Sequence, residues 1–267
     1  MLKKRVIFTL LYDNGNFMLS RNFRLQKVGD MKWLKKNYNF SHIAFSIDEL
    51  IILDVTRGER NEEIFYEHVQ LLNDECFVPI AAGGSIRNLE QARKLLHSGA
   101  DKVVINTLLA EDLGVIAEIA REFGQQSIVA SVDVKLINGE FTVWTNNGSI
   151  NQNTSLTKWL ENIVSLPIGE VYLNSVDRDG TGHGYKTELI EQIPDLFSMP
   201  VILAGGAGKY SHFLEVLADE RVDAVATANL LNFIGDGLEK SRQELLDEDF
   251  NLPVWDLTLA TDLKNCL

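Results

Sequence analysis

Two glycine pairs have the residue types and spacing of an anion-binding site. Gly83-Gly84 and Gly205-Gly206 lie 122 positions apart, and each pair follows a short apolar run. Glycines let backbone N–H groups approach an anion because no Cβ atom stands in the way. The sequence therefore predicts two phosphate-binding loops; the alternative is that these glycines serve only tight turns. Each loop would be completed at the end of the next apolar run, by Asn106 and Thr107 in the first and by Ala228 and Asn229 in the second.

The same offset relates other residues and predicts a doubled structural unit. It pairs Asp101 with Asp223 and Val103 with Val225, and a fixed period through several blocks indicates an internal repeat. At the same offset, Asp133 is matched by Leu11. Asp133 could transfer protons, whereas the other half has lost its carboxylate.

Alternating β-rich runs and helical patterns indicate parallel strands joined by crossover helices. Helical spacing is clear in residues 89–96 and 113–120. The doubling favours a closed (β/α)₈ barrel over an open doubly wound sheet. We expect one domain at 1–246, with halves at about 1–122 and 123–246, and a C-terminal extension at 247–267. Eight strands are predicted, at Arg5–Leu11, Leu50–Val55, Val78–Ala82, Lys102–Ile105, Ser127–Val134, Gly169–Asn174, Pro200–Ala204 and Asp223–Ala226.

Two asparagine-glycine pairs punctuate this pattern. Asn138-Gly139 separates two β-rich runs and predicts a hairpin after the fifth strand. The segment Tyr12-Asp13-Asn14-Gly15 is typical of a turn that ends the first strand.

Composition excludes several classes of function. The net charge of −13 argues against nucleic-acid binding, because phosphate backbones need clustered Lys and Arg. Two cysteines, Cys76 and Cys266, give no disulfide framework and favour a reducing, cytoplasmic setting, with Cys76 expected in the core. The apolar N-terminal run is too short to span a membrane. No histidine pair has metal-ligand spacing, and we expect neither a metal nor a cofactor.

Several strings resemble the cyclase subunit of imidazole glycerol phosphate synthase, the HisF type, from Met1 to about residue 246. The family is a (β/α)₈ barrel that receives ammonia from a docked glutaminase and cyclises a bisphosphorylated substrate. The resemblance implies that Asp179, Gly180 and Thr181 face the substrate. It is carried by Ala82-Gly83-Gly84-Ser85-Ile86-Arg87, Asp101-Lys102-Val103, Ile105-Asn106-Thr107, Asp177-Arg178-Asp179-Gly180-Thr181 and Gly205-Gly206-Ala207-Gly208.

The resemblance also implies two catalytic carboxylates, and one is missing. Asp133 matches the carboxylate of strand five, but Leu11 stands where the strand-one carboxylate belongs, and leucine cannot carry a proton. Leu19 stands where the family has a lysine; Arg21 lies two residues further on. Asp13 could replace the lost acid only if it shares the face of Leu11.

The ammonia entrance is better preserved. By resemblance, Arg5, Glu49, Lys102 and Glu170 form a charged gate at the N-terminal mouth of the barrel, and Asp101 faces the glutaminase. The alternative is an ordinary set of salt bridges at the base of a barrel.

A retained entrance with a lost acid is similar to a HisF-like branch associated with glycosyl amidation. That branch has Leu10-Leu11, Glu75-Cys76-Phe77 and the string from Gly169 to Ser175. It implies service to a glutaminase and a separate amidotransferase that makes acetamidino groups on surface-polysaccharide sugars. Two alternatives stay open: a histidine-pathway cyclase, and a non-catalytic phosphosugar-binding scaffold.

Two further residues have open roles. His183, between two glycines, could donate to a ligand or lie on a surface loop. Asp177 could help to orient substrate or pair with Arg178.

Overall fold

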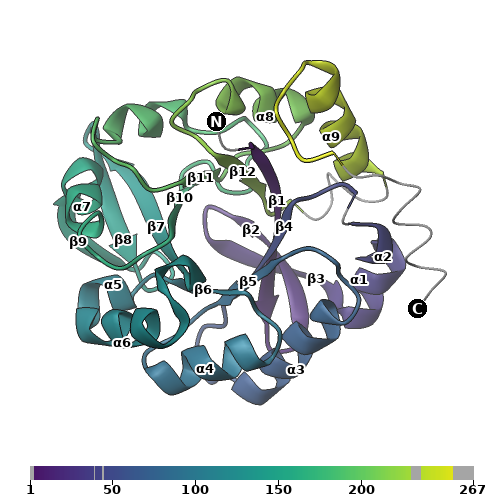
Figure 1. Cartoon of the computed structure of the whole chain (residues 1–267), viewed down its shortest axis with the longest axis horizontal. Coiled ribbons are helices and arrows are strands. Elements are labelled where there is room, and N and C mark those ends of the chain that lie inside the picture. Colours follow the sequence, from purple (N-terminus) through teal and green to yellow (C-terminus); the bar gives the residue numbers. More distant parts are fainter. Residues whose placement is uncertain (1–2, 39, 44, 230–235, 255–267) are drawn as a thin grey trace.

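The chain forms a closed barrel of eight parallel strands surrounded by helices (Figure 1). The computed structural model describes residues 3–38, 40–43, 45–229 and 236–254. Pairing runs β10-β11-β12-β1-β4-β5-β6-β7, and β10 pairs with β7 to close the ring. The predicted (β/α)₈ barrel is therefore confirmed. Its strands are β1 (Arg5–Asp13), β4 (Glu49–Asp54), β5 (Ile80–Gly83), β6 (Lys102–Ile105), β7 (Ile128–Ile137), β10 (Glu170–Ser175), β11 (Val201–Ala204) and β12 (Ala224–Thr227).

The barrel strands are apolar throughout because both of their faces are buried. In β1, Val6, Phe8 and Leu10 face the layer between sheet and helices, whereas Ile7 faces the barrel interior. The interior cluster contains one large aromatic residue, Tyr172, among aliphatic side chains that include four alanines.

Helices cover the outside of the barrel and follow the predicted patterns (Figure 1). Residues 89–96 lie within α4 and residues 113–120 within α6, each started by an N-cap side chain, Asn88 and Asp112 respectively. The crossover from β10 to β11 contains a 3₁₀ segment, Thr187–Gln192. The helices are α1 (Met31–Asn37), α2 (Phe40–Ile43), α3 (Glu62–Asn73), α4 (Leu89–His97), α5 (Leu108–Glu111), α6 (Leu113–Phe123), α7 (Leu156–Ile163), α8 (Tyr210–Leu217) and α9 (Gly237–Asp247).

Each half of the barrel begins with a long strand that continues into antiparallel strands. The predicted hairpin at Asn138-Gly139 joins β7 to β8 (Glu140–Thr145), and β9 (Ile150–Ser155) follows. The expectation that Tyr12–Gly15 is a turn was wrong at its start. Tyr12 and Asp13 belong to β1, and Asn14-Gly15 alone turns the chain into β2 (Asn16–Arg21) and β3 (Arg24–Asp30). Both Asn-Gly pairs have positive φ, as a two-residue hairpin turn requires.

At the base of the barrel, three aspartates each accept a backbone N–H at or next to the first residue of a strand. Asp101 accepts the backbone N–H of Ile80 at 2.8 Å, and Asp223 does the same for Val201 at 2.9 Å. Asp48 accepts the N–H of Val6 at 2.8 Å. Asp48 also makes a buried, two-pronged ion pair with Arg242 of α9, with both N···O distances at 2.8 Å.

The described start of the expected C-terminal extension packs on the base of the barrel. The Asn251 carbonyl accepts the backbone N–H of Lys4 at 2.9 Å, and the Pro253 carbonyl accepts from Arg242 at 2.6 Å. Leu252 is buried. Residues 255–267 lie outside the described part of the chain, together with Trp255 and Cys266.

We predict that Arg242→Met lowers the free energy of unfolding by about 3–5 kcal/mol, because it leaves the buried Asp48 carboxylate without its cation. Lys240→Met on the same helix is the matched control. Its ion pair with Asp236 is exposed, so the loss should stay below about 1 kcal/mol. Urea denaturation of both variants checks this, and equal losses would contradict it.

Candidate functional site

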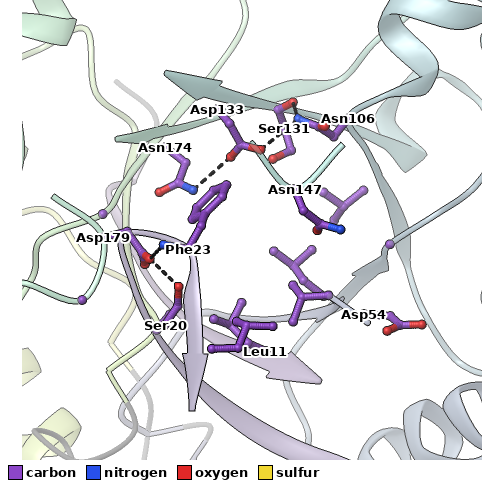
Figure 2. Close-up of a pocket in the computed structure, with 18 of the residues that line it drawn as sticks. Leu11, Ser20, Phe23, Asp54, Asn106, Ser131, Asp133, Asn147, Asn174 and Asp179 are labelled. Carbon is purple, nitrogen blue, oxygen red and sulfur yellow. Dashed lines mark hydrogen bonds between the residues drawn. The ribbon is translucent and has the colours of Figure 1, made fainter. Parts of the chain in front are cut away.

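A pocket of about 360 Å³ opens at the C-terminal ends of the barrel strands. Every barrel strand, or the loop directly after it, contributes to the wall, as do the β2–β3 hairpin and the loop between β8 and β9. This is the end of a (β/α)₈ barrel at which active sites are built. Figure 2 shows Asp133, Asn174, Ser131 and Asn106 together on one side of the opening, while Ser20, Asp179 and Asp54 lie elsewhere around it.

Asp133 is the buried carboxylate at the centre of this polar side. Its Oδ1 accepts from Asn174 Nδ2 at 3.0 Å, and its Oδ2 accepts from Asn106 Nδ2 at 3.2 Å. Burial raises the pKa of Asp133 to about 7, against the smaller opposing effect of the Asn174 hydrogen bond. A carboxyl group with this pKa can both take up and release a proton near neutral pH.

Leu11 lies across the pocket from Asp133 (Figure 2). It is almost fully buried at 8% exposure and lines the same cavity. Leu19 and Arg21, two residues apart on β2, both line the pocket, as does Ser20 between them. Asp13 pairs with Asn16 at the hairpin turn and is not among the lining residues, so it does not stand in for the lost acid.

Two other aspartates line the pocket, and both are engaged elsewhere. Asp54 accepts the backbone N–H of Thr56 at 3.0 Å and lies 3.8 Å from Arg60. The Asp179 carboxylate accepts from the Ser20 hydroxyl and from the backbone N–H of Phe23, the latter at 3.0 Å. Burial raises the pKa of Asp179 despite these two hydrogen bonds. Asp179 therefore holds the β2–β3 hairpin over the pocket.

Gly180 makes this closure possible. A Cβ atom at that position would lie 1.8 Å from the carbonyl oxygen of Ser20. Gly180 lines the pocket, whereas Thr181 is not among the lining residues and donates its hydroxyl to the Arg178 carbonyl at 2.8 Å.

The first predicted phosphate loop is only partly in the pocket. Gly84, Asn106 and Thr107 line it, but Gly83 is buried in β5, where a Cβ would lie 2.2 Å from the Val104 carbonyl oxygen. Ser85 also lines the pocket and has a φ of 57°, a conformation that residues other than glycine rarely adopt.

The second loop faces the pocket more completely, with Gly205, Gly206, Ala228 and Asn229 all in its wall. Gly205 and Gly206 have positive φ, and a Cβ on Gly206 would lie 2.1 Å from the Gly184 carbonyl oxygen. Residues 230–235, where a helix could begin, lie outside the described part of the chain.

The four expected gate residues form a closed ring at the base of the barrel. Arg5 contacts Glu49 at 2.9 Å and Glu170 at 2.7 Å. Lys102 contacts Glu49 at 3.0 Å and Glu170 at 2.5 Å. Each is the first residue of its strand, so the ring lies at the opposite end from the pocket. Burial opposes ionisation of Glu170, but Arg5 and Lys102 lower its pKa overall.

Tyr172 lies in the barrel interior between the ring and the pocket. It belongs to the interior cluster and also lines the pocket. Its hydroxyl lies 3.4 Å from the Thr9 hydroxyl, and burial raises its pKa above the ordinary value. A small molecule that travels through the barrel would have to pass this phenol.

Three other candidates lie away from the pocket. His183 is exposed and outside the lining set. Asp177 accepts the backbone N–H of Leu136 at 2.7 Å, and Arg178 donates to the His183 carbonyl at 3.4 Å, so neither shows the ion pair considered for them. Asp101 is exposed at the base, directly before Lys102.

Sequence reasoning missed several residues of the wall. Asn174, Phe23, Asn146 and Asn147 line the pocket, the last two from the β8–β9 loop. Arg24, Arg57, Arg60 and Arg87 also line it. The Asn14-Gly15 turn was the signal for the β2–β3 hairpin that brings Phe23 and Arg24 to the pocket.

Among the described residues, no cluster of three or more His, Cys, Asp or Glu side chains could hold a metal ion. No helix in the described ranges is both long and apolar enough to cross a membrane. Cys76 is buried, as expected.

We predict that Asp133→Asn gains stability relative to the natural protein as pH rises. The pKa of Asp133 is raised from 3.8 to about 7, so the folded protein favours the protonated acid and loses stability as pH rises through this interval. Asparagine cannot ionise, so the difference should grow by up to about 4 kcal/mol and then level off. Any misfit with Asn174 adds a pH-independent offset. Urea denaturation at pH 5 and pH 8 measures the slope, and an unchanged difference would contradict it.

Comparisons with known proteins identify relatives along the whole chain. The family model "Histidine biosynthesis protein" matches residues 28–235. A protein of Parasynechococcus marenigrum, named "Putative imidazole glycerol phosphate synthase subunit hisF2", is 46% identical over 265 residues, covering 99% of this chain and 98% of that protein.

Two proteins named "Imidazole glycerol phosphate synthase subunit HisF" are also similar. The one from Thermotoga sp. is 37% identical over 87% of this chain and 90% of its own length. The one from Saccharolobus solfataricus is 36% identical over 90% of this chain and 93% of its own length. With this coverage, the chain belongs to the histidine biosynthesis protein family, as a HisF-type barrel.

Proposed function

We propose that this chain is a HisF-type subunit that receives ammonia from a glutaminase partner and passes it on without cyclising a substrate itself. The ammonia would serve the amidation of a surface-polysaccharide sugar, forming an acetamidino group, together with a separate amidotransferase. The observation that supports this most directly is the pairing of an intact charged ring at the base with Asp133 facing Leu11 at the top.

The ring supports the partner half of the proposal. Four charges of alternating sign lie at the end of the barrel furthest from the pocket, with side-chain exposures of 3–22%. Asp101 is exposed at the base directly before Lys102, although one of its carboxylate oxygens accepts the backbone N–H of Ile80, and this position would face a docked protein. Several relatives are named as synthase subunits, which supports an assembly.

Leu11 supports the second part of the proposal, that the chain does not cyclise a substrate. A cyclisation with loss of a leaving group needs one group to donate a proton and another to remove one. Asp133 can serve one role only, and the leucine side chain occupies the opposite wall. Asp54 and Asp179 are already held by Thr56, Ser20 and Phe23.

Cyclase activity in histidine biosynthesis is the second candidate. It is favoured by the pKa of Asp133 at about 7 and by full-length similarity to HisF proteins. It would need the protonation chemistry to run with a single free carboxylate.

We predict that this gene does not restore growth to a bacterium lacking its HisF subunit on medium without histidine. Leu11→Asp should raise cyclase activity, measured with ammonium salt, at least about tenfold, because it restores a second carboxylate across from Asp133. Leu53→Asp, at another lining position, is the control and should gain nothing. Growth with the natural gene would favour the cyclase.

We also predict that the purified chain increases glutamine hydrolysis by its HisH-type glutaminase. Lys102→Met should reduce this stimulation at least about fivefold, because Glu49 and Glu170 would then share only Arg5. Arg93→Met, on the exposed face of α4, is the control and should leave it unchanged. If the natural chain does not stimulate the glutaminase, the proposed ammonia role is wrong and the non-catalytic scaffold is favoured. If Lys102→Met stimulates it fully, the charged ring has no part in communication with the glutaminase.

A further inference from the structure

The described cations of the pocket wall all come from one half of the sequence. Five arginines line the pocket, all from the first half of the chain, accompanied there by one carboxylate, Asp54. Among the described residues, the second half contributes two aspartates, Asp133 and Asp179, and no lysine, arginine or histidine. We name the five cations the arginine rim: Arg21, Arg24, Arg57, Arg60 and Arg87.

The positive charge of the arginine rim contrasts with the negative net charge of the protein. The chain has a net charge of −13, so a cluster of cations around this pocket is opposite in sign to the net charge of the protein. Concave walls of one charge raise the local concentration of a ligand of the opposite charge.

Members of the rim have unused hydrogen-bonding capacity. Arg21 and Arg24 are opposite each other on β2 and β3 at the end of the hairpin, and both residues are exposed. Arg60 Nη1 is buried with no hydrogen-bond partner among the described residues, since the Asp54 carboxylate is 3.8 Å away. A buried donor left unsatisfied is unfavourable, so a shift of this side chain toward a ligand oxygen in the pocket would relieve it.

Two further members of the rim have contacts that fix their position. Arg57, on the loop after β4, donates to the Phe23 carbonyl oxygen and so links that loop to the β2–β3 hairpin. Arg87 lies beside Gly84 and Ser85, whose backbone forms the first phosphate loop, and contacts Glu111 at 3.1 Å. The cations thus come from three segments, the β2–β3 hairpin and the loops after β4 and β5, and the Arg57 contact ties the first two together.

The two phosphate loops therefore differ in the charge that they can balance. The second loop offers backbone groups, and the half of the chain that carries it adds no cation to the described lining, which suits a neutral or singly anionic group. The first is bordered by guanidinium groups, which bind phosphate oxygens in a two-pronged manner. Five guanidinium groups together offer more N–H donors than the oxygens of one phosphate can accept, whereas two linked phosphates supply more acceptor oxygens over a larger arc.

We propose that the arginine rim binds a diphosphate group, so that the pocket holds a metabolite activated by diphosphate at one end and not a bisphosphate with equivalent ends. The inference deepens the proposed function and rests on it only for the identity of the compound as the sugar to be amidated; that this pocket holds the compound is part of the inference. The carbohydrate end would then extend toward the second loop and Asp133.

Titration calorimetry with inorganic pyrophosphate and inorganic phosphate, at constant ionic strength, tests the proposal on the isolated full-length chain. We expect pyrophosphate to bind at least tenfold more tightly than phosphate. Arg57→Ala and the double variant Arg21→Ala/Arg24→Ala should each weaken pyrophosphate at least tenfold and phosphate by less than threefold. Arg93→Ala, an exposed arginine outside the pocket, is the matched control, and circular dichroism verifies that each variant is folded.

Equal affinity for the two anions, or pyrophosphate binding unaffected in both rim variants, would overturn the proposal. So would an equal loss in Arg93→Ala, because it would show a general effect of charge. The titration contains no glutaminase and no ammonia, so its failure does not depend on ammonia delivery. Conversely, if the arginine rim binds pyrophosphate but the chain does not stimulate the glutaminase, the diphosphate site is supported and the ammonia role is contradicted.

Discussion

The chemistry of this barrel depends on one buried carboxyl group that faces an aliphatic wall. Asp133 is held by two asparagine amides, and burial brings its pKa to about 7. Across the pocket, Leu11 can neither donate nor accept a proton. The remaining acids of the wall are committed to backbone and hydroxyl donors, so the site has the parts for one proton transfer and not for a matched pair.

The two ends of the barrel differ in how their charges are arranged. At the base, Arg5, Glu49, Lys102 and Glu170 neutralise one another in a closed ring that excludes unbalanced charge. At the top, five arginines from the first half of the sequence line the pocket, and Asp179 from the second half holds the β2–β3 hairpin over it. Tyr172 separates the two ends within the interior. Under the proposed function a small neutral molecule enters at the base, and under the proposed diphosphate site an anion is held in the pocket.

Local sequence patterns predicted the barrel well because strands buried on both faces must be continuous apolar runs. They failed where tertiary contacts decide. The apolar run through Tyr12 looked complete, so the two further strands after Asn14-Gly15 were missed. Gly83 looked like part of an anion loop but is required for the close approach of β5 and β6. The arginine rim gathers residues from separate loops that share no motif, so only the folded chain brings them together.

The most direct test of the central claim follows the nitrogen atom. The natural chain, its glutaminase, amide-¹⁵N glutamine and the bisphosphorylated cyclase substrate are combined, and the label is traced by NMR. The account predicts that the label is recovered as free ammonium while the bisphosphorylated compound remains intact. Labelled imidazole product formed at the rate of glutamine hydrolysis would contradict it, because it would show that Asp133 suffices without a partner at position 11.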